Sequence, residues 1–144
     1  MIRKILFGLV FSLFLTAWDT PPAPTIDWVP YETAFAQAEQ EHKQVVIIFS
    51  APWCRACNSY EHNVLTNPRV IRMSRHFVMV HINVDEQQDI NQQYRPDGGY
   101  IPRTLVFRED GTHRSELHRN AAPLYFFDVH NPNELLALFQ RARH

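Results

Sequence analysis

The sequence predicts a single α/β domain whose central mixed β-sheet, a parallel pair plus an antiparallel hairpin, has helices on both faces. Two continuous β-branched and aromatic runs, 45–49 and 77–84, are typical of central strands buried on both faces. Helical segments separate these runs, and a strand, helix, strand order implies a parallel pair with a right-handed connection. A third run at 104–107 is turned back at 110–111 into a weaker strand at 112–117.

The first part of the domain follows from hydrophobic periodicity and capping signals. Residues 26–28 predict a short edge strand, and 31–42 predict an amphipathic helix. The apolar positions of 54–66 fall on one helical face. Asn67 and Pro68 end that helix and begin a short one, with Asn67 as the N-cap and Pro68 at the first helical position.

The last helix is predicted by its first residues. Residues 85–100 are polar and predict a loop. At 131–134, Asn131 is the expected cap, Pro132 the expected first residue and Glu134 an acid in the first turn. An apolar stripe follows, made of Leu135, Leu138 and Phe139.

The N-terminus predicts a targeting segment. Residues 1–18 combine two basic residues with an apolar run at 5–18, and we expect them to form a signal peptide or an N-terminal membrane anchor. The run is shorter than the ~20 residues of a permanent span, yet no good small-x-small cleavage site follows it. A proline-rich linker is expected at 19–25 and the folded domain at 26–144. We therefore expect a bacterial periplasmic protein, soluble or N-terminally anchored.

Composition excludes several classes of protein. The formal net charge of −1, from 14 basic and 15 acidic residues, does not favour a nucleic-acid partner. Two cysteines are too few for a disulfide scaffold or a four-thiolate zinc site. No histidine spacing indicates a metal site, so we expect no bound metal.

The cysteine pair is the strongest chemical signal. Cys54 and Cys57 lie between a buried strand and an amphipathic helix, which places Cys54 at a helix N-terminus. The partial positive charge there and the neighbouring Arg55 favour a thiolate. Cys57 is one helical turn further on, and we expect it to be more buried and less acidic. This asymmetry suits attack by Cys54 and release of the substrate by Cys57.

Other roles for the pair remain open. A structural zinc site would need two more ligands, and a purely structural disulfide would close too small a loop to constrain the unfolded chain much. A copper-binding metallochaperone is one alternative function, because paired thiolates favour Cu(I). A redox-inert chaperone or adaptor is another.

The sequence from Trp53 to Cys57, together with Ile101-Pro102 at the head of a strand, resembles the thioredoxin superfamily. Residues 77–83 and 96–103 are similar to those of the small endoplasmic-reticulum proteins of the anterior-gradient group. The resemblance covers roughly 26–142. It implies a thioredoxin fold and a cis Ile101–Pro102 bond against the cysteines. The backbone of Ile101, with Pro102, would then hold an extended peptide, and Trp53 would shield the disulfide and contact substrate.

The sequence also departs from that family. Many thioredoxins carry a buried acid where this chain has Ile48, and a lysine where it has His81. His81 and Arg55 are therefore candidates for tuning the pKa values of the cysteines. The Arg-Ala dipeptide between the cysteines matches neither reducing nor strongly oxidising relatives, so the redox direction is open.

These observations predict a protein thiol–disulfide oxidoreductase with catalytic Cys54 and Cys57. Its redox-active disulfide would need no dissociable cofactor. Expected partners are protein substrates bearing thiols or disulfides and an electron donor or acceptor protein. We expect a monomer that contacts a membrane only through an uncleaved anchor.

Overall fold

The computed structural model describes residues 23–144. The predicted leader at 1–18 and the first part of the predicted linker lie outside the described residues. Nine elements follow in order: α1 (Tyr31–Glu41), β1 (Gln44–Ser50), α2 (Arg55–Tyr60), the π-helix η1 (Glu61–Leu65), α3 (Pro68–Ser74), β2 (Phe77–Asn83), α4 (Gln88–Gln93), β3 (Arg103–Phe107) and α5 (Asn133–Ala142). Within 23–144, no helix combines the length and the apolar character that crossing a membrane requires.

One mixed sheet forms the centre of the domain, with the strand order β2-β1-β3. β1 is parallel to β2, with Ile48 opposite His81, and antiparallel to β3, with Phe49 opposite Arg103. β1 lies in the middle because its interior is wholly apolar and can be buried on both faces. The predicted α/β class, with a parallel pair and an antiparallel strand, is confirmed.

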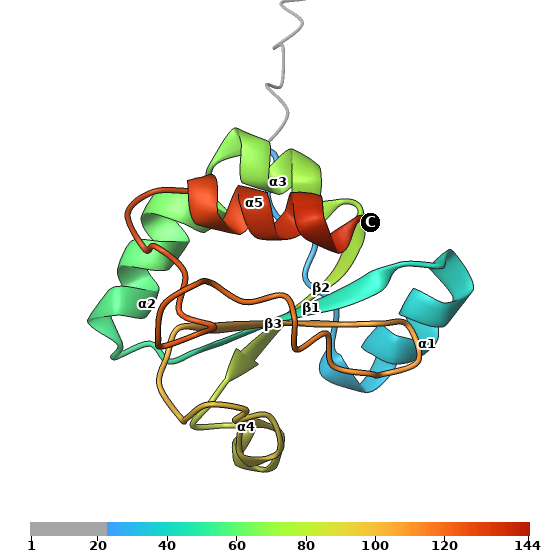
Figure 1. Cartoon of the computed structure of the whole chain (residues 1–144), viewed down its shortest axis with the longest axis horizontal. Coiled ribbons are helices and arrows are strands. Elements are labelled where there is room, and N and C mark those ends of the chain that lie inside the picture. Colours follow the sequence, from blue (N-terminus) through green and yellow to red (C-terminus); the bar gives the residue numbers. More distant parts are fainter. Residues whose placement is uncertain (1–22) are drawn as a thin grey trace, which may run out of the picture.

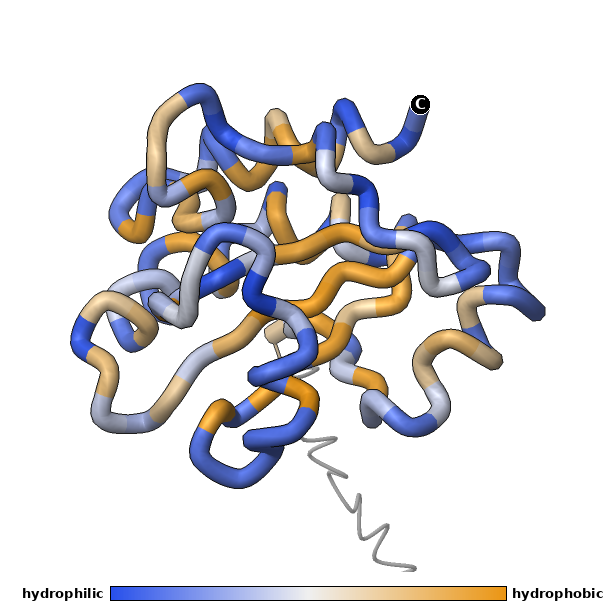
Figure 2. The backbone as a smooth tube through the Cα atoms, turned by 60° about the horizontal axis from the view of Figure 1, so that its bottom comes forward, coloured by the Kyte–Doolittle hydropathy of each residue, from blue (hydrophilic) through white to orange (hydrophobic). Residues whose placement is uncertain are grey.

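Helices cover both faces of the sheet and enclose two apolar cores. Alternate residues of β1 point to opposite faces. Val46 and Ile48 belong to the core under η1, α3 and α5, whereas Ile47 and Phe49 belong to the core under α1 and α4. Figure 1 shows α3 and α5 together on one side of the sheet, and Figure 2 shows the strands as the most hydrophobic part of the backbone.

The edge strand predicted at 26–28 and the weaker strand predicted at 112–117 are each reduced to a single bridge. Trp28 makes one parallel bridge with Met79, and Phe107 makes one antiparallel bridge with His113. The turn after β3 does form, since Arg108 N donates to Thr112 O over 2.8 Å. The expected strand at 112–117 does not continue because Leu117 is the only apolar residue in it, so no apolar face holds the ladder in place.

The polar segment 85–100 was predicted as a loop but contains the helix α4. Four of the six residues of α4 are glutamine or asparagine, and no apolar stripe marks the helix in the sequence. Its buried residue is Asn91. Glutamine is a good helix former, so local propensity and one polar anchor are enough for this short element.

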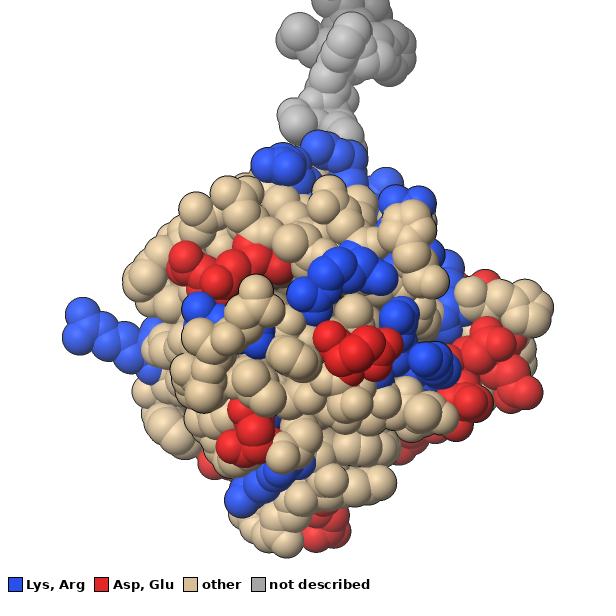
Figure 3. Space-filling view, in the orientation of Figure 1, with Lys and Arg blue, Asp and Glu red and all other residues tan. Residues whose placement is uncertain are grey.

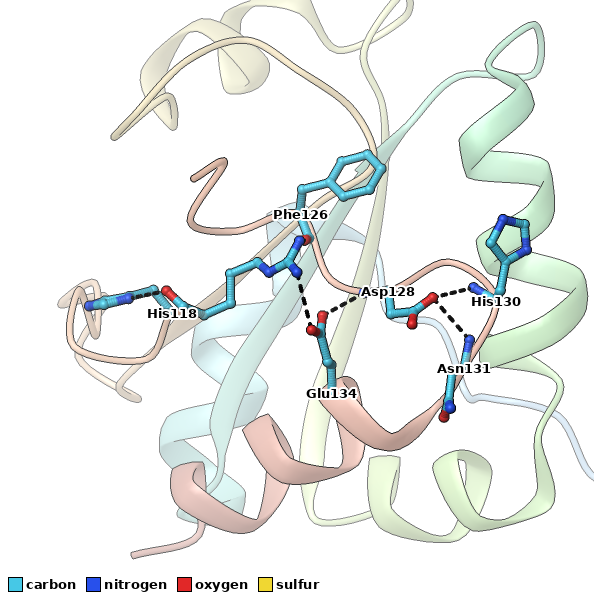
Figure 4. A network of polar contacts seen from close by, with 7 residues as sticks. His118, Phe126, Asp128, His130, Asn131 and Glu134 are labelled. Atoms are coloured by element: carbon cyan, nitrogen blue, oxygen red, sulfur yellow. Dashed lines mark hydrogen bonds and ion pairs between the residues drawn. The ribbon is translucent and has the colours of Figure 1, made fainter. Parts of the chain in front are cut away.

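The last helix begins later than its capping signal predicts. α5 starts at Asn133, and Pro132 occupies the N-cap position instead of the first helical position. Asn131 Oδ1 accepts the backbone N–H of Asn133 over 3.0 Å, so this side chain still caps the first turn. Figure 4 shows Glu134 reaching back to the N–H of Asp128 (2.7 Å), which ties the preceding loop to the helix.

The surface carries charges of both signs. Figure 3 shows basic and acidic side chains side by side on one face of the molecule.

Candidate active site

The two cysteines lie at the junction between β1 and α2. After β1 ends at Ser50, a turn closed by Cys54 N donating to Ala51 O (3.1 Å) leads into the helix. Cys54 is the N-cap of α2, and its Sγ accepts the backbone N–H of Cys57 over 3.1 Å. Cys54 and Cys57 form a disulfide, with their Cα atoms 5.2 Å apart. The sulfur of Cys54 therefore occupies the helix-capping position, where unpaired N–H groups favour a thiolate.

The two sulfurs differ in their surroundings more than in their exposure. Cys54 is 6% exposed and Cys57 5%, so the expected greater burial of Cys57 amounts to a negligible difference. Cys54 Sγ lies 3.8 Å from the carbonyl oxygen of Ile101. Cys57 instead borders a cavity of about 260 Å³ on the side of β2. The chemical asymmetry of the pair comes from these two different neighbourhoods.

The Ile101–Pro102 segment lies beside the cysteines, and its peptide bond is cis. A second cis bond joins Ala122 to Pro123. Because β3 pairs with β1, the residues that precede β3 arrive next to the residues that follow β1. Pro102 is buried, and Ile101 is half-buried against the cluster formed by the two cysteines and Ala51.

Trp53 is the most prominent exposed side chain at the site. It is 69% exposed, and its indole Nε1 donates to Asp85 Oδ2 over 2.7 Å. Asp85 follows β2 and reads in the sequence as an ordinary solvated loop acid, so its role in orienting Trp53 was not predicted. No spacing signal links residues 32 positions apart; the parallel pairing of β1 and β2 brings their ends together.

Arg55 and His81, the two candidates for tuning the cysteines, occupy different positions. Arg55 is the first residue of α2, is exposed, and forms no ion pair with a carboxylate of 23–144. His81 lies on β2, where its Nε2 is 2.5 Å from Ser50 Oγ and its ring centroid is 5.2 Å from that of Trp28. His81 is an exposed residue of β2, although the Trp28 ring packs near its imidazole. The atoms packed around the ring lower its pKa below the ordinary value, and the nearby Glu61 opposes this shift.

The cavity behind Cys57 joins polar groups from three elements. Its wall includes Ser50 of β1, Glu61 of η1 and both His81 and Asn83 of β2. Sequence analysis did not identify Glu61. The helix predicted at 54–66 changes to a π-helix at Glu61, with Thr66 N donating to Glu61 O over 3.2 Å, and such a turn cannot be recognised from spacing.

Within residues 23–144, no three His, Cys, Asp or Glu side chains come together in a way that could hold a metal ion. Ile48, at the position where many thioredoxins carry an acid, is buried in the apolar core. Its strand partner is His81, so the ionisable groups beside Cys57 come from β2 and η1 and not from β1.

Comparison with known proteins agrees with this arrangement. The sequence model of the thioredoxin-like family matches residues 27–109. Anterior gradient protein 1 of Xenopus laevis is 26% identical over 122 residues, which are 83% of this chain and 65% of that protein. The chain thus spans about two thirds of the length of that relative.

Solved structures show the same fold. A thioredoxin from Thermus thermophilus superposes with a TM-score of 0.60 at 24% identity, covering 81% of this chain and 86% of its own. A disulphide isomerase from Xylella fastidiosa superposes with a TM-score of 0.58 at 22% identity, covering 78% of this chain and 88% of its own. With more than half of its length matched by the family model, the chain belongs to the thioredoxin-like family.

Proposed function

We propose that this protein is a thiol–disulfide oxidoreductase that acts on protein disulfides. The observation that carries the proposal is the Cys54–Cys57 disulfide at the start of α2, with Cys54 Sγ 3.8 Å from the carbonyl of Ile101. One sulfur of a reversible pair thus lies beside a backbone segment that can receive an extended peptide. The likeness in fold to the disulphide isomerase of Xylella fastidiosa supports the same activity.

The reaction uses the two cysteines in sequence. In the reduced protein, the Cys54 thiolate attacks one sulfur of a substrate disulfide, and the other substrate sulfur leaves as a thiolate. Cys57 then loses its proton and attacks Cys54 Sγ, which releases the second substrate sulfur. The substrate gains two electrons, and the protein is left with the Cys54–Cys57 disulfide. Oxidation of a dithiol substrate runs the same steps in reverse.

The substrate is an extended segment of a protein chain. The backbone of Ile101, with Pro102, would align this segment as an added strand, with its sulfur against Cys54. The exposed ring of Trp53, held by Asp85, offers an apolar surface next to Cys54. No dissociable cofactor takes part, and an electron donor or acceptor protein restores the pair after each turnover.

The proposed enzyme works outside the cytoplasm as a monomer. The apolar run at 5–18, preceded by Arg3 and Lys4, supports export across the inner membrane, with the domain free in the periplasm or anchored at its N-terminus. An oxidising compartment of this kind is also where protein disulfides persist as substrates.

Reduction of insulin disulfides tests the assignment. We expect Cys54→Ser to abolish turnover, because it removes the attacking thiolate, and Cys57→Ser to accumulate mixed disulfides, because it removes the releasing thiol. Ser59→Ala, on the same helix, is the matched control and should retain activity. Full turnover by the Cys54→Ser protein would refute the assignment.

The two alternative functions give different results. Stoichiometric Cu(I) binding by the reduced wild type, without any disulfide exchange, would instead support a metallochaperone. Normal function of a Cys54→Ala/Cys57→Ala protein would support a redox-inert chaperone. Equilibration with glutathione determines the redox direction of an active enzyme. A reduction potential of about −270 mV indicates a reductase, and one of about −120 mV indicates an oxidant.

A further inference from the structure

Arg103 is a fully buried charged residue immediately after Pro102. It is 0% exposed, and no carboxylate of residues 23–144 forms an ion pair with it. Its Nη1 donates to the carbonyl of Tyr100 over 2.7 Å, and its Nη2 donates to Asn91 Oδ1 over 2.8 Å. Its Nε is buried without a partner among the described residues.

The guanidinium remains charged although both of its hydrogen-bond partners are neutral. Burial lowers the pKa of Arg103 to about 10, which still leaves it protonated at neutral pH. Two charged groups nearby act in opposite directions on its pKa, since Asp97 raises it and Arg95 lowers it. Its Cζ lies 4.3 Å from the centroid of the Phe49 ring, a cation–π contact that offsets part of the lost hydration. A buried cation with only neutral partners is unfavourable for stability, and an apolar residue would fill the same volume without that cost. A structural role alone is therefore a weak explanation for this residue.

The contacts of Arg103 converge on the segment that lies against Cys54. Asn91 belongs to α4 and Phe49 to β1, so the arginine is held between these two elements. From there it fixes the carbonyl of Tyr100. The next carbonyl along the chain, that of Ile101, is the one that lies 3.8 Å from Cys54 Sγ.

The phenol of Tyr100 is held as well, and not by Arg103. It donates to Asp97 Oδ1 over 2.6 Å and accepts the N–H of Tyr125 over 3.0 Å. The side chain of Tyr100 is thus fixed by the neighbouring loops, while its carbonyl is fixed by Arg103. Loss of the second constraint would free the peptide plane that leads into Ile101.

We propose that Arg103 is a positioning residue that holds the Tyr100–Pro102 backbone in register with Cys54 for pairing with an extended peptide substrate. This role rests on the proposed oxidoreductase function. A peptide substrate uses the Ile101 backbone and Cys54 together, so a small displacement of that backbone misaligns its sulfur. A small disulfide such as hydroxyethyl disulfide meets Cys54 alone and does not need the Ile101 backbone.

The proposal predicts a split between the two kinds of substrate. In Arg103→Lys the charge remains, but a single ammonium cannot span both acceptors as the planar guanidinium does. We expect its kcat/KM for insulin to fall about tenfold, mainly through KM, while its rate with hydroxyethyl disulfide stays within about twofold of wild type. Arg108→Lys, in the exposed position just after β3, is the matched control and should change neither rate.

A second pair of variants tests the same contact without changing Arg103. Asn91→Leu removes the acceptor for Nη2 and should show the same selective loss with insulin. Asn91→Asp keeps an acceptor oxygen and should retain activity with both substrates. Thermal unfolding establishes that each variant is folded at the assay temperature. If Arg103→Lys is unfolded, the milder Asn91 variants carry the test.

The outcomes separate this proposal from the one it rests on. A wild type that reduces neither insulin nor hydroxyethyl disulfide contradicts the oxidoreductase function and the role of Arg103 with it. The other case is a wild type that reduces both substrates. The positioning role alone is then contradicted if the folded Arg103→Lys and Asn91→Leu proteins lose both activities equally, or lose neither. Wild-type activity of Arg103→Lys with insulin would show that the charge of Arg103 matters and its geometry does not, and would likewise overturn the positioning role.

Discussion

At the scale of single residues, His113 is a half-buried titratable group in the segment after β3. Its ring lies between those of Phe107 and Tyr125, with centroids 5.2 and 5.4 Å away. Its Nε2 is buried without a partner in the described part of the chain. Burial lowers the pKa of His113 below its ordinary value, and the nearby Glu116 only partly opposes this. The folded protein therefore prefers the neutral imidazole.

This preference makes stability depend on pH. The unfolded chain, with a histidine pKa of about 6.5, binds the proton more readily than the folded chain. Above that pH the imidazole is neutral in both states, so this group costs the folded protein no stability. The free energy of unfolding should fall as pH drops below about 6.5, by less than about 1.4 kcal/mol per pH unit for this group. Urea denaturation at several pH values should show a shallower dependence in His113→Phe. The exposed His76→Phe is the control, and an unchanged slope in His113→Phe would contradict the prediction.

The residues of the site differ in how visible they are in the sequence. Cys54 and Cys57 were predicted from their spacing and context, and Pro102 from the family resemblance. Asp85, Glu61 and Arg103 have no such pattern. In the sequence, each of them looks like an ordinary surface charge. Only the strand pairing of the folded chain shows which groups lie beside it.

At the scale of elements, the start of α3 was predicted from the Asn67-Pro68 pair. Asn67 Oδ1 accepts the N–H of Arg69 over 2.9 Å, and Pro68 is the first helical residue, as expected. We expect Asn67→Ala to lower the free energy of unfolding by about 1 kcal/mol, because it leaves a backbone donor of this short helix without its cap. Chemical denaturation measures the change. Asn120→Ala, at an exposed position where the side chain forms no hydrogen bond within 23–144, is the control, and equal stability of the two variants would show that the cap contributes nothing.

Elements were predictable wherever apolar residues repeat with a clear period. β1 and β2 are continuous apolar runs, and α5 carries an apolar stripe, so each was found close to its observed position. α4 was missed because its buried contact is the amide of Asn91 and not an apolar face. The strand expected at 112–117 does not form, because a turn without an apolar face to bury does not hold a strand against the sheet.

At the scale of the whole molecule, the parallel pairing of β1 and β2 creates the site. The chain leaves both strands at the same edge of the sheet, which is where ligand sites of open α/β sheets generally form. Cys54 and Trp53 follow β1, and Asp85 follows β2. β3, antiparallel to β1, brings Pro102 to the same edge. Three segments far apart in the sequence thus surround one disulfide.

We expect the same pairing to give Cys57 an outlet for its proton. The cavity of about 260 Å³ at Cys57 is large enough for several water molecules, each of which takes about 30 Å³ in the liquid. Glu61 and His81 line it, and the lowered pKa of His81 leaves its imidazole neutral and able to accept a proton at pH 7. Cys57 must lose its proton before it attacks the mixed disulfide. We therefore expect the cavity to connect the releasing thiol to a proton acceptor.

This connection predicts a defect confined to the second step. His81→Gln should leave formation of the mixed disulfide unchanged and slow its release by Cys57 at least about tenfold at pH 7, because it removes a general base. In wild type, release should accelerate as pH rises through the pKa of His81, and the variant should lose this dependence. Quenched-flow measurement of the mixed disulfide separates the two steps. His62→Gln, an exposed histidine of η1 outside the cavity wall, should behave as wild type. Normal release in both His81→Gln and Glu61→Gln would show that the proton leaves by another route.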